Sequence, residues 1–284
     1  MGIVYLNGRY LPIEEATVPV LDRGFIYGDG VYELIPVYGR KPFRMAEHLV
    51  RLKNSMSRIR LTNPHSDDEW AAILGRVVAE QPFDNQGVYF QVTRGVAKRD
   101  HVFPLGVTPT VFMMSNPLAT PTADVVANGV ACVTSVDERW LNCDIKSISL
   151  LGNVLMRQLA ADSDAVETVM FRDGFLTEAS ASNVLVVRDG AVLAPPKDRM
   201  ILPGITYGAI YDFARHGGMP FEMQPIRESE VWKADELWLS SSTKEVVAIV
   251  TLDGRPVGHP SHAGRPGPLF ERMHALFQAA KAAL

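Results

Sequence analysis

The chain is poor in the residues that build cross-linked or metal-bound proteins. Only two of its 284 residues are cysteines, Cys132 and Cys143. Two thiols cannot form the disulfide framework of a small secreted domain, and the cysteines and histidines show none of the spacings typical of metal ligands. We therefore expect free thiols, and no bound metal.

Excess positive charge and long apolar segments are absent as well. The formal net charge is −4, which argues against a general nucleic-acid-binding protein. The longest apolar runs, such as residues 246–250, are far shorter than a membrane span. Residues 1–6 contain no basic segment leading into an apolar stretch, so no signal peptide is visible. These features predict a soluble, cytoplasmic protein.

The remaining composition is that of a globular enzyme with two domains. Hydrophobic residues make up 47% and charged residues 21% of the chain, and 284 residues suffice for two cores. The proline-containing segment 117–121 favours extended chain and predicts a linker. We expect a small N-terminal α+β domain at 1–116 and a larger C-terminal domain at 122–284, with a ligand in the cleft between them.

Several local patterns predict individual elements. Asn7-Gly8 separates two short apolar runs, which indicates a hairpin with a tight primed turn. Ser66 and Glu69 have the spacing of a capping box at the start of a helix. Further along, the apolar patterns predict a strand over residues 125–136, a helix over 150–161, a helix from about 206 and a last helix from about 269.

Lys146 differs from the other lysines in its surroundings. It lies in the segment Asp144-Ile145-Lys146-Ser147-Ile148, which leads directly into an apolar stretch expected to be helical. A lysine amine removed from water is more often neutral and can then attack an aldehyde. The residues alone equally fit a lysine at a helix start whose amine reaches the solvent.

The wider context of Lys146 resembles the fold type IV aminotransferases. This family includes branched-chain aminotransferases, D-amino-acid aminotransferases and aminodeoxychorismate lyases. The similarity covers nearly the whole chain, and the combination of short motifs in this order is highly specific. The motifs are Asp22-Arg23-Gly24, Gly28 to Glu33, Glu47 to Leu52, Asp144 to Asn153, Phe175 to Asn183, Leu202 to Thr206 and Ser240 to Thr243.

The resemblance implies a two-domain α+β fold with pyridoxal 5'-phosphate held as a Schiff base on Lys146 in the interdomain cleft. It places Glu178 opposite the ring nitrogen of the cofactor and Leu202 against the ring face. A helix start offers backbone amides and a favourable dipole to a phosphate group. The implied phosphate ligands are Arg51, Ile205, Thr206 and Ser242. The neighbouring hydroxyls of residues 241 and 243 could take the place of Ser242. Thr206 alone also fits the role of a simple helix cap.

The substrate is suggested by the pattern Lys98-Arg99-Asp100-His101, which is similar to that of D-amino-acid aminotransferases. There, an arginine, a histidine and a tyrosine bind the substrate carboxylate, and the matching residues are Arg99, His101 and Tyr32. A guanidinium fork suits a carboxylate, and the other two groups add directional donors. Taken singly, each of the three also fits a solvated loop or a half-buried strand aromatic.

The expected function is therefore a D-amino-acid transaminase that uses D-alanine and 2-oxoglutarate by a ping-pong mechanism through pyridoxamine phosphate. The resemblance also implies a homodimer, in which the loop carrying Arg99 and His101 reaches the site of the partner subunit. Alternatives are a branched-chain L-amino-acid transaminase, an R-selective amine transaminase, and an aminodeoxychorismate lyase, against which the Arg99-x-His101 pattern weighs. A cofactor-binding protein without catalysis is the non-enzymatic alternative.

Overall fold

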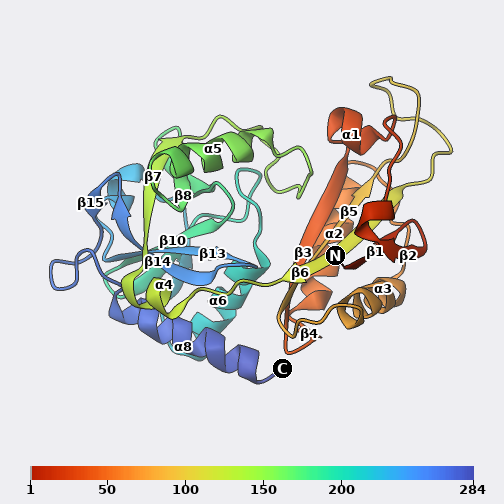
Figure 1. The fold of residues 1–284 in the computed structure, drawn as a ribbon. Coiled ribbons are helices and arrows are strands. Elements are labelled where there is room, and N and C mark those ends of the chain that lie inside the picture. The colour runs from red at the N-terminus through yellow and green to blue at the C-terminus, as the bar shows by residue number, and fades with distance from the viewer. Residues whose placement is uncertain (1) are drawn as a thin grey trace. The chain divides into compact units, whose positions relative to one another are not determined.

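A computed structural model describes residues 2–284, and the chain folds into two compact units (Figure 1). The first unit contains the chain up to Ala119 together with Ile145–Leu150, and the second contains Thr120–Asp144 and Leu151–Leu284. The segment Ile145–Leu150 lies in the first unit although it follows the expected linker in sequence. Among the described residues, no helix has both the length and the apolar character needed to cross a membrane.

The first unit is built on a six-stranded sheet in which every pairing is antiparallel. Its first two strands form the predicted hairpin: Asn7 and Gly8 have φ angles of 49° and 87°, as a primed turn requires. In spatial order the strands are β2 (Arg9–Pro12), β1 (Ile3–Leu6), β6 (Thr110–Pro117), β5 (Gln86–Thr93), β3 (Gly30–Tyr38) and β4 (Lys41–Pro42).

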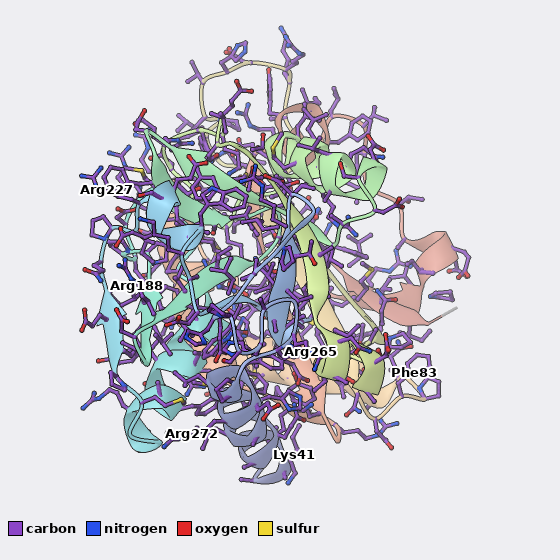
Figure 2. The ribbon with its side chains drawn as sticks, turned by 90° about the vertical axis from the view of Figure 1, so that its left-hand side faces the viewer. Lys41, Phe83, Arg188, Arg227, Arg265 and Arg272 are labelled. Atoms are coloured by element: carbon purple, nitrogen blue, oxygen red, sulfur yellow. The ribbon has the colours of Figure 1, made fainter. Side chains whose placement is uncertain are left out.

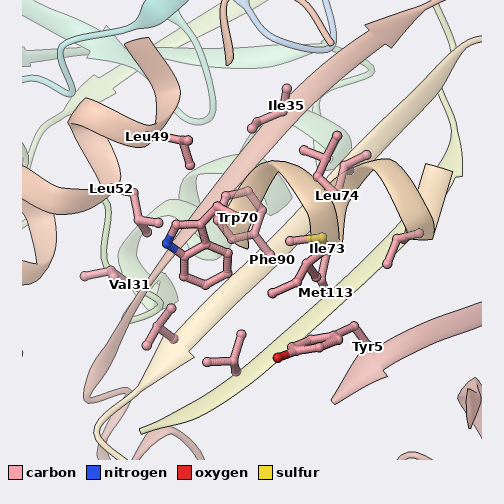
Figure 3. Packing of buried hydrophobic residues seen from close by; sticks show 14 of the residues in the cluster. Tyr5, Val31, Ile35, Leu49, Leu52, Trp70, Ile73, Leu74, Phe90 and Met113 are labelled. Carbon is pink, nitrogen blue, oxygen red and sulfur yellow. The ribbon is translucent and has the colours of Figure 1, made fainter. Parts of the chain in front are cut away.

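Helices α2 (Met45–Arg58) and α3 (Asp67–Ala79) pack their apolar sides against this sheet (Figure 3). Trp70 of α3 lies against Phe90 of β5, with Leu52 of α2 in the same buried cluster. The predicted capping box is confirmed, since Ser66 and Glu69 exchange hydrogen bonds at the start of α3. The remaining helices of this unit are the short η1 (Ile13–Glu15) and α1 (Arg23–Tyr27).

The second unit is built on a nine-stranded mixed sheet. Strand β7 runs parallel to both of its neighbours, β14 and β8, whereas β10, β13 and β14 pair antiparallel. In spatial order the strands are β12 (Phe221–Met223), β11 (Ala191–Ala194), β10 (Asn183–Arg188), β13 (Glu236–Ser241), β14 (Glu245–Leu252), β7 (Val130–Val136), β8 (Glu167–Arg172) and β9 (Phe175–Ala179), with β15 (Arg255–Pro256) beside β14.

The prediction of one strand over residues 125–136 was wrong in its first part. Residues Ala123–Asn128 form helix α4, and β7 begins only at Val130. The Thr122 hydroxyl caps the helix by accepting from the Val125 N–H at 3.2 Å, and Gly129 ends it at a φ of 68°. The threonine cap begins the helix and the glycine ends it, so the apolar run forms a helix followed by a strand.

The other helices of the second unit agree with the predictions. Helix α5 (Leu151–Asp162) packs against β7 and β8. Helix α6 (Ile205–His216) packs against β13, α8 (Pro268–Ala282) packs against β13 and β14, and the two helices contact each other. A single turn, α7 (Glu228–Val231), precedes β13. Arg227 and Arg272 are among the exposed charged side chains on the outer surface of this unit (Figure 2).

Candidate active site

Lys146 lies beside the beginning of β3 in the first unit. Its carbonyl accepts from the Tyr32 N–H at 2.9 Å, and its own N–H donates to the Ser55 hydroxyl at 3.1 Å. The neighbouring Ser147 forms an isolated β-bridge with Val31. The Lys146 main chain is therefore fixed between β3 and α2, five residues before α5 begins at Leu151. Its Nζ lies 4.1 Å from the centre of the Tyr32 ring, so these two predicted site residues are in contact.

Arg51 of α2 forms a buried ion pair with Glu33 of β3. Its Nε and Nη2 donate to the two Glu33 carboxylate oxygens at 2.7 and 2.8 Å, and His48 Nδ1 lies 2.7 Å from Glu33 Oε2. All three side chains are at most 7% exposed. A guanidinium held along one edge has a single orientation, so Glu33 determines where Arg51 points.

Burial and charge act in opposite directions on this cluster. Burial alone raises the pKa of Glu33, but the Arg51 and His48 charges and hydrogen bonds outweigh it and hold that pKa well below its usual range. For His48, burial lowers the pKa despite the opposing charge of Glu33. The cluster therefore contains an ionised carboxylate against a permanent guanidinium, with a histidine that tends to be neutral.

Arg99 and His101 lie together on the exposed loop between β5 and β6. Both contact Tyr27 of α1: the Arg99 guanidinium is 5.4 Å from its ring centre, and the His101 and Tyr27 rings are 5.4 Å apart. Tyr32 instead lies beside Tyr89, with ring centres 5.6 Å apart. Within the described part of the chain, no hydrogen bond or ring contact joins Tyr32 to Arg99 or His101, so one chain brings only two of the three together.

The base of this loop is fixed by a second buried ion cluster. Asp29 accepts from Arg23 Nε at 2.7 Å and from Arg94 Nε and Nη2 at 2.8 and 2.9 Å. Arg23 Nη1 also donates to the Asp100 carbonyl at 2.5 Å, and the Arg94 guanidinium lies 3.7 Å from the centre of the Phe103 ring. Two arginines that share Asp29 thus contact the loop at Asp100 and Phe103.

In the second unit, Glu178 stands near the end of β9 and both of its carboxylate oxygens are engaged. Oε1 accepts from Arg139 Nη1 at 2.5 Å, while Oε2 accepts from the Leu202 N–H at 2.9 Å and from Asn183 Nδ2 at 3.2 Å. Asn183 Nδ2 also donates to the Leu202 carbonyl at 2.9 Å. Two predicted site residues, Glu178 and Leu202, are therefore joined directly.

Gly204 makes room for this arrangement. A Cβ atom at residue 204 would stand 2.1 Å from Asn183 Oδ1, a distance that no side chain can occupy. Glycine is needed here for close approach rather than for an unusual backbone angle, since its φ is −62°. The chain from Leu202 to the start of α6 can therefore pack tightly on Asn183.

Arg139 was not singled out from the sequence. Its Nε and Nη2 donate to the two carboxylate oxygens of Asp137, each at 2.9 Å, and Asp137 also pairs with Arg172 at 3.1 Å. Burial raises the pKa of Glu178 above its ordinary value, although the charge and hydrogen bond of Arg139 oppose this rise. An Asp-x-Arg pair in a loop is too common a pattern to have marked Arg139 in advance.

The start of α6 provides backbone donors. Gly204 is its N-cap, without a side-chain hydrogen bond, so Ile205 and Thr206 occupy the first turn and Thr206 is not the cap. Helix α6 packs against β13, near whose end the buried Ser240 hydroxyl has no hydrogen-bond partner among the described residues. Ser242 lies in the turn that follows, whereas the Ser241 hydroxyl accepts from the Lys244 N–H at 3.1 Å within that turn. An uncapped helix start and an unpaired hydroxyl suit an anionic group.

Comparison with known proteins identifies the family. The family model described as amino-transferase class IV matches residues 30–252. The chain belongs to the class IV aminotransferases. This class IV aminotransferase is 36% identical over 275 residues to a D-alanine aminotransferase of Bacillus licheniformis, covering 97% of this chain and 95% of the relative. It is 37% identical over 279 residues to a D-alanine aminotransferase of Staphylococcus aureus (strain COL), covering 98% and 97% of the two chains.

Solved structures confirm the fold type IV architecture. The Escherichia coli branched-chain amino acid aminotransferase superposes with a TM-score of 0.90 at 24% identity, covering 98% of this chain and 94% of that one. The T.th. branched-chain amino acid aminotransferase with pyridoxamine 5'-phosphate has a TM-score of 0.89 at 25% identity, covering 99% and 94%. The resemblance inferred from the sequence motifs is confirmed.

Class IV aminotransferases use pyridoxal 5'-phosphate, and the donors in this chain fit that cofactor. The start of α6 and the unpaired Ser240 hydroxyl suit its phosphate, and a buried carboxylate such as Glu178 suits a protonated ring nitrogen. The enzyme is therefore a pyridoxal-phosphate-dependent aminotransferase.

Proposed function

We propose that this enzyme transfers the amino group of a D-amino acid, D-alanine foremost, to a 2-oxo acid such as 2-oxoglutarate by a ping-pong mechanism. The observation that carries the proposal is the identity of 36–37% to D-alanine aminotransferases over nearly the full length of both chains. The superposed branched-chain aminotransferases are more distant, at 24–25% identity. They make an L-branched-chain transaminase the second candidate.

In this proposal residues that are far apart in the chain have separate roles toward the cofactor. Lys146 of the first unit binds the cofactor covalently and moves the proton at the substrate Cα. Glu178 would hold the ring nitrogen of the cofactor, and Leu202 would contact its ring. When bound, the cofactor supplies the electron sink of the reaction. The phosphate is assigned to Arg51, Ile205, Thr206 and Ser242, and the unpaired Ser240 hydroxyl is a further donor that suits it.

Two contacts support these roles for Lys146 and Arg51. The fixed main chain of Lys146 limits its amine to the range of its own side chain, beside the Tyr32 ring. The Glu33 carboxylate fixes the plane of the Arg51 guanidinium. A cationic and a nucleophilic group are thus both held by the same strand, β3.

We assign recognition of the substrate carboxylate to Tyr32, Arg99 and His101, with the last two supplied by a partner subunit. Arg99 and His101 contact Tyr27, while Tyr32 contacts Lys146, which supports a division of the three between subunits. Exposed apolar side chains near the loop and on α5 provide surface for a homodimer. They include Phe25 (76% exposed), Leu105 (96%), Leu151 (72%), Val154 (58%) and Leu155 (57%).

A half-reaction screen tests the proposal. The purified enzyme with bound cofactor is mixed with single D- or L-amino acids, and the rate at which the visible absorption band disappears is measured. We expect D-alanine to react fastest and L-valine and L-leucine to react slowly or not at all. A faster half-reaction with L-valine or L-leucine than with D-alanine would establish the branched-chain alternative.

A further inference from the structure

Arg139 lies at the centre of a buried charge cluster that the proposed roles leave unexplained. One edge of its guanidinium is bound to Asp137 through two hydrogen bonds of 2.9 Å, and its Nη1 donates to Glu178 at 2.5 Å. Arg172 pairs with Asp137 at 3.1 Å and also donates to the Arg139 carbonyl at 2.6 Å. The four side chains carry two negative and two positive charges, all at most 11% exposed.

The cluster fixes Arg139 more firmly than an ion pair on the surface could. A pair on the surface contributes little stability and leaves both side chains mobile. Here, by contrast, the Thr177 hydroxyl donates to Asp137 at 2.9 Å, so the carboxylate that holds Arg139 is itself held. On the other side, a Cβ at Gly152 of α5 would stand 3.1 Å from Arg139 Cγ, so the helix start lies directly against the arginine stem.

Glu178 needs this partner because of where it lies. A buried carboxylate without an opposite charge takes up a proton, since the charged form is poorly solvated there. A neutral carboxyl group could not balance a positive ring nitrogen. The backbone N–H of Leu202 and the Asn183 amide reach only Oε2, so Arg139 alone holds Oε1 among the described contacts of this side chain.

We propose that Arg139 is a positioning residue of the reaction, which balances the charge of Glu178 and fixes the orientation of its carboxylate toward the cofactor ring. The inference rests on the proposed function, in which Glu178 contacts the ring nitrogen. Arg139 itself touches neither cofactor nor substrate in this assignment. Asp137 and Arg172 in turn hold Arg139.

The test uses the enzyme loaded with pyridoxal phosphate that carries ¹⁵N in its ring. The ¹⁵N chemical shift reports directly whether the ring nitrogen is protonated, and it is followed against pH. We expect the ring nitrogen of Arg139→Met to lose its proton at a lower pH than that of the unchanged enzyme. The expected difference is about one pH unit or more, which corresponds to roughly a tenfold change in the protonation equilibrium of the ring nitrogen. We expect kcat to fall roughly tenfold or more, with KM changing much less.

Three further variants make the result specific. Arg139→Lys retains the charge without the fork and should recover part of the loss. Arg188→Met removes a half-exposed arginine of the same unit, paired with Glu230 at 3.3 Å, and should leave both the ¹⁵N profile and kcat unchanged. If Arg139→Met does not fold, Gly152→Ala replaces it, because the added methyl group presses on Arg139 Cγ; a smaller shift of the ¹⁵N profile in the same direction is then expected.

Glu178→Gln distinguishes a failure of the role of Arg139 from a failure of the role of Glu178. If it alters the ¹⁵N profile while Arg139→Met, or Gly152→Ala in its place, matches the unchanged enzyme, the role of Arg139 is refuted and that of Glu178 stands. If Glu178→Gln also leaves the profile unchanged, the assignment of Glu178 to the ring nitrogen fails, and the inference for Arg139 fails with it. If Arg139→Met and Glu178→Gln both lose the ring proton at a lower pH than the unchanged enzyme, both assignments are supported.

Discussion

The substitution Glu33→Gln tests whether the buried ion pair at Arg51 determines the stability of the first unit. The side chain of Glu33 is fully buried, with Arg51 Nε and Nη2 at 2.7 and 2.8 Å and His48 Nδ1 at 2.7 Å. Glutamine retains the size of the side chain but removes its charge, so the buried Arg51 guanidinium loses the carboxylate that binds its Nε and Nη2. The matched control is Glu47→Gln on the same helix as Arg51, where the pair with Arg44 spans 3.5 Å and Glu47 is 49% exposed.

The two substitutions should differ strongly in magnitude. Removing one partner of a buried ion pair costs about 3–5 kcal/mol. An exposed pair contributes about 0–1 kcal/mol, so the control should change little. At about 2 °C per kcal/mol for a protein of this size, Glu33→Gln should lower the midpoint of thermal unfolding by roughly 6–10 °C.

The assay is thermal unfolding of the cofactor-free protein, followed by circular dichroism over a range of pH. The folded-state pKa of Glu33 lies below its ordinary 4.5, so its contribution to stability is present above pH 4.5 and declines as pH falls through the folded-state pKa. The folded-state pKa of His48 is also lowered from its ordinary 6.5, so below pH 6.5 the unfolded chain binds more protons than the folded chain. His48 therefore also lowers the stability as the pH falls. Equal midpoints for Glu33→Gln and Glu47→Gln at neutral pH would refute the reasoning.

Three further predictions concern the assigned residues Lys146 and Arg99, and Gly204 at the start of α6. Lys146→Ala should remove the visible absorption band of the bound cofactor and nearly all turnover; near-native turnover would exclude the assignment. Arg99→Ala should lower kcat/KM for D-alanine by an amount that corresponds to a loss of about 2–5 kcal/mol of transition-state stabilisation. Simple amines without a carboxylate should react almost as before. Gly204→Ala should weaken cofactor binding, because the added Cβ would stand 2.1 Å from Asn183 Oδ1 and would displace that side chain. The affinity is measured by titrating the cofactor-free protein with the cofactor, and an unchanged affinity would show that the loop adapts.

Features that depend on a few adjacent residues were predictable from the sequence. The hairpin at Asn7-Gly8 follows from two residues that tolerate positive φ, and the capping box from Ser66 and Glu69 at the proper spacing. The error at residues 125–128 shows the limit of this reasoning. Apolar periodicity over a short segment fits a helix as well as a strand. The residue that indicated a helix here was Thr122, which caps α4.

The ion pairs around the site residues could not be found in the same way. Arg139 and Glu178 are 39 residues apart in the chain, and Arg94 and Asp29 are 65 apart. Neither separation follows from helical or strand periodicity, since both pairs form only when distant segments meet in the folded sheet. Motif similarity marked Glu178, but it gave no reason to select Arg139.

These pairs share one physical arrangement. Each buried carboxylate that holds a candidate site element has more than one donor: Glu33 lies between Arg51 and His48, Asp29 between Arg23 and Arg94, and Asp137 between Arg139 and Arg172.

In a buried environment such multiply bonded charges resist reorientation, because each lost contact leaves an unpaired charge of high free energy. The groups that they hold therefore keep one orientation. A site whose side chains are already ordered spends less of the binding free energy of its cofactor on ordering them, and we propose that the charge clusters order the assigned site in this way.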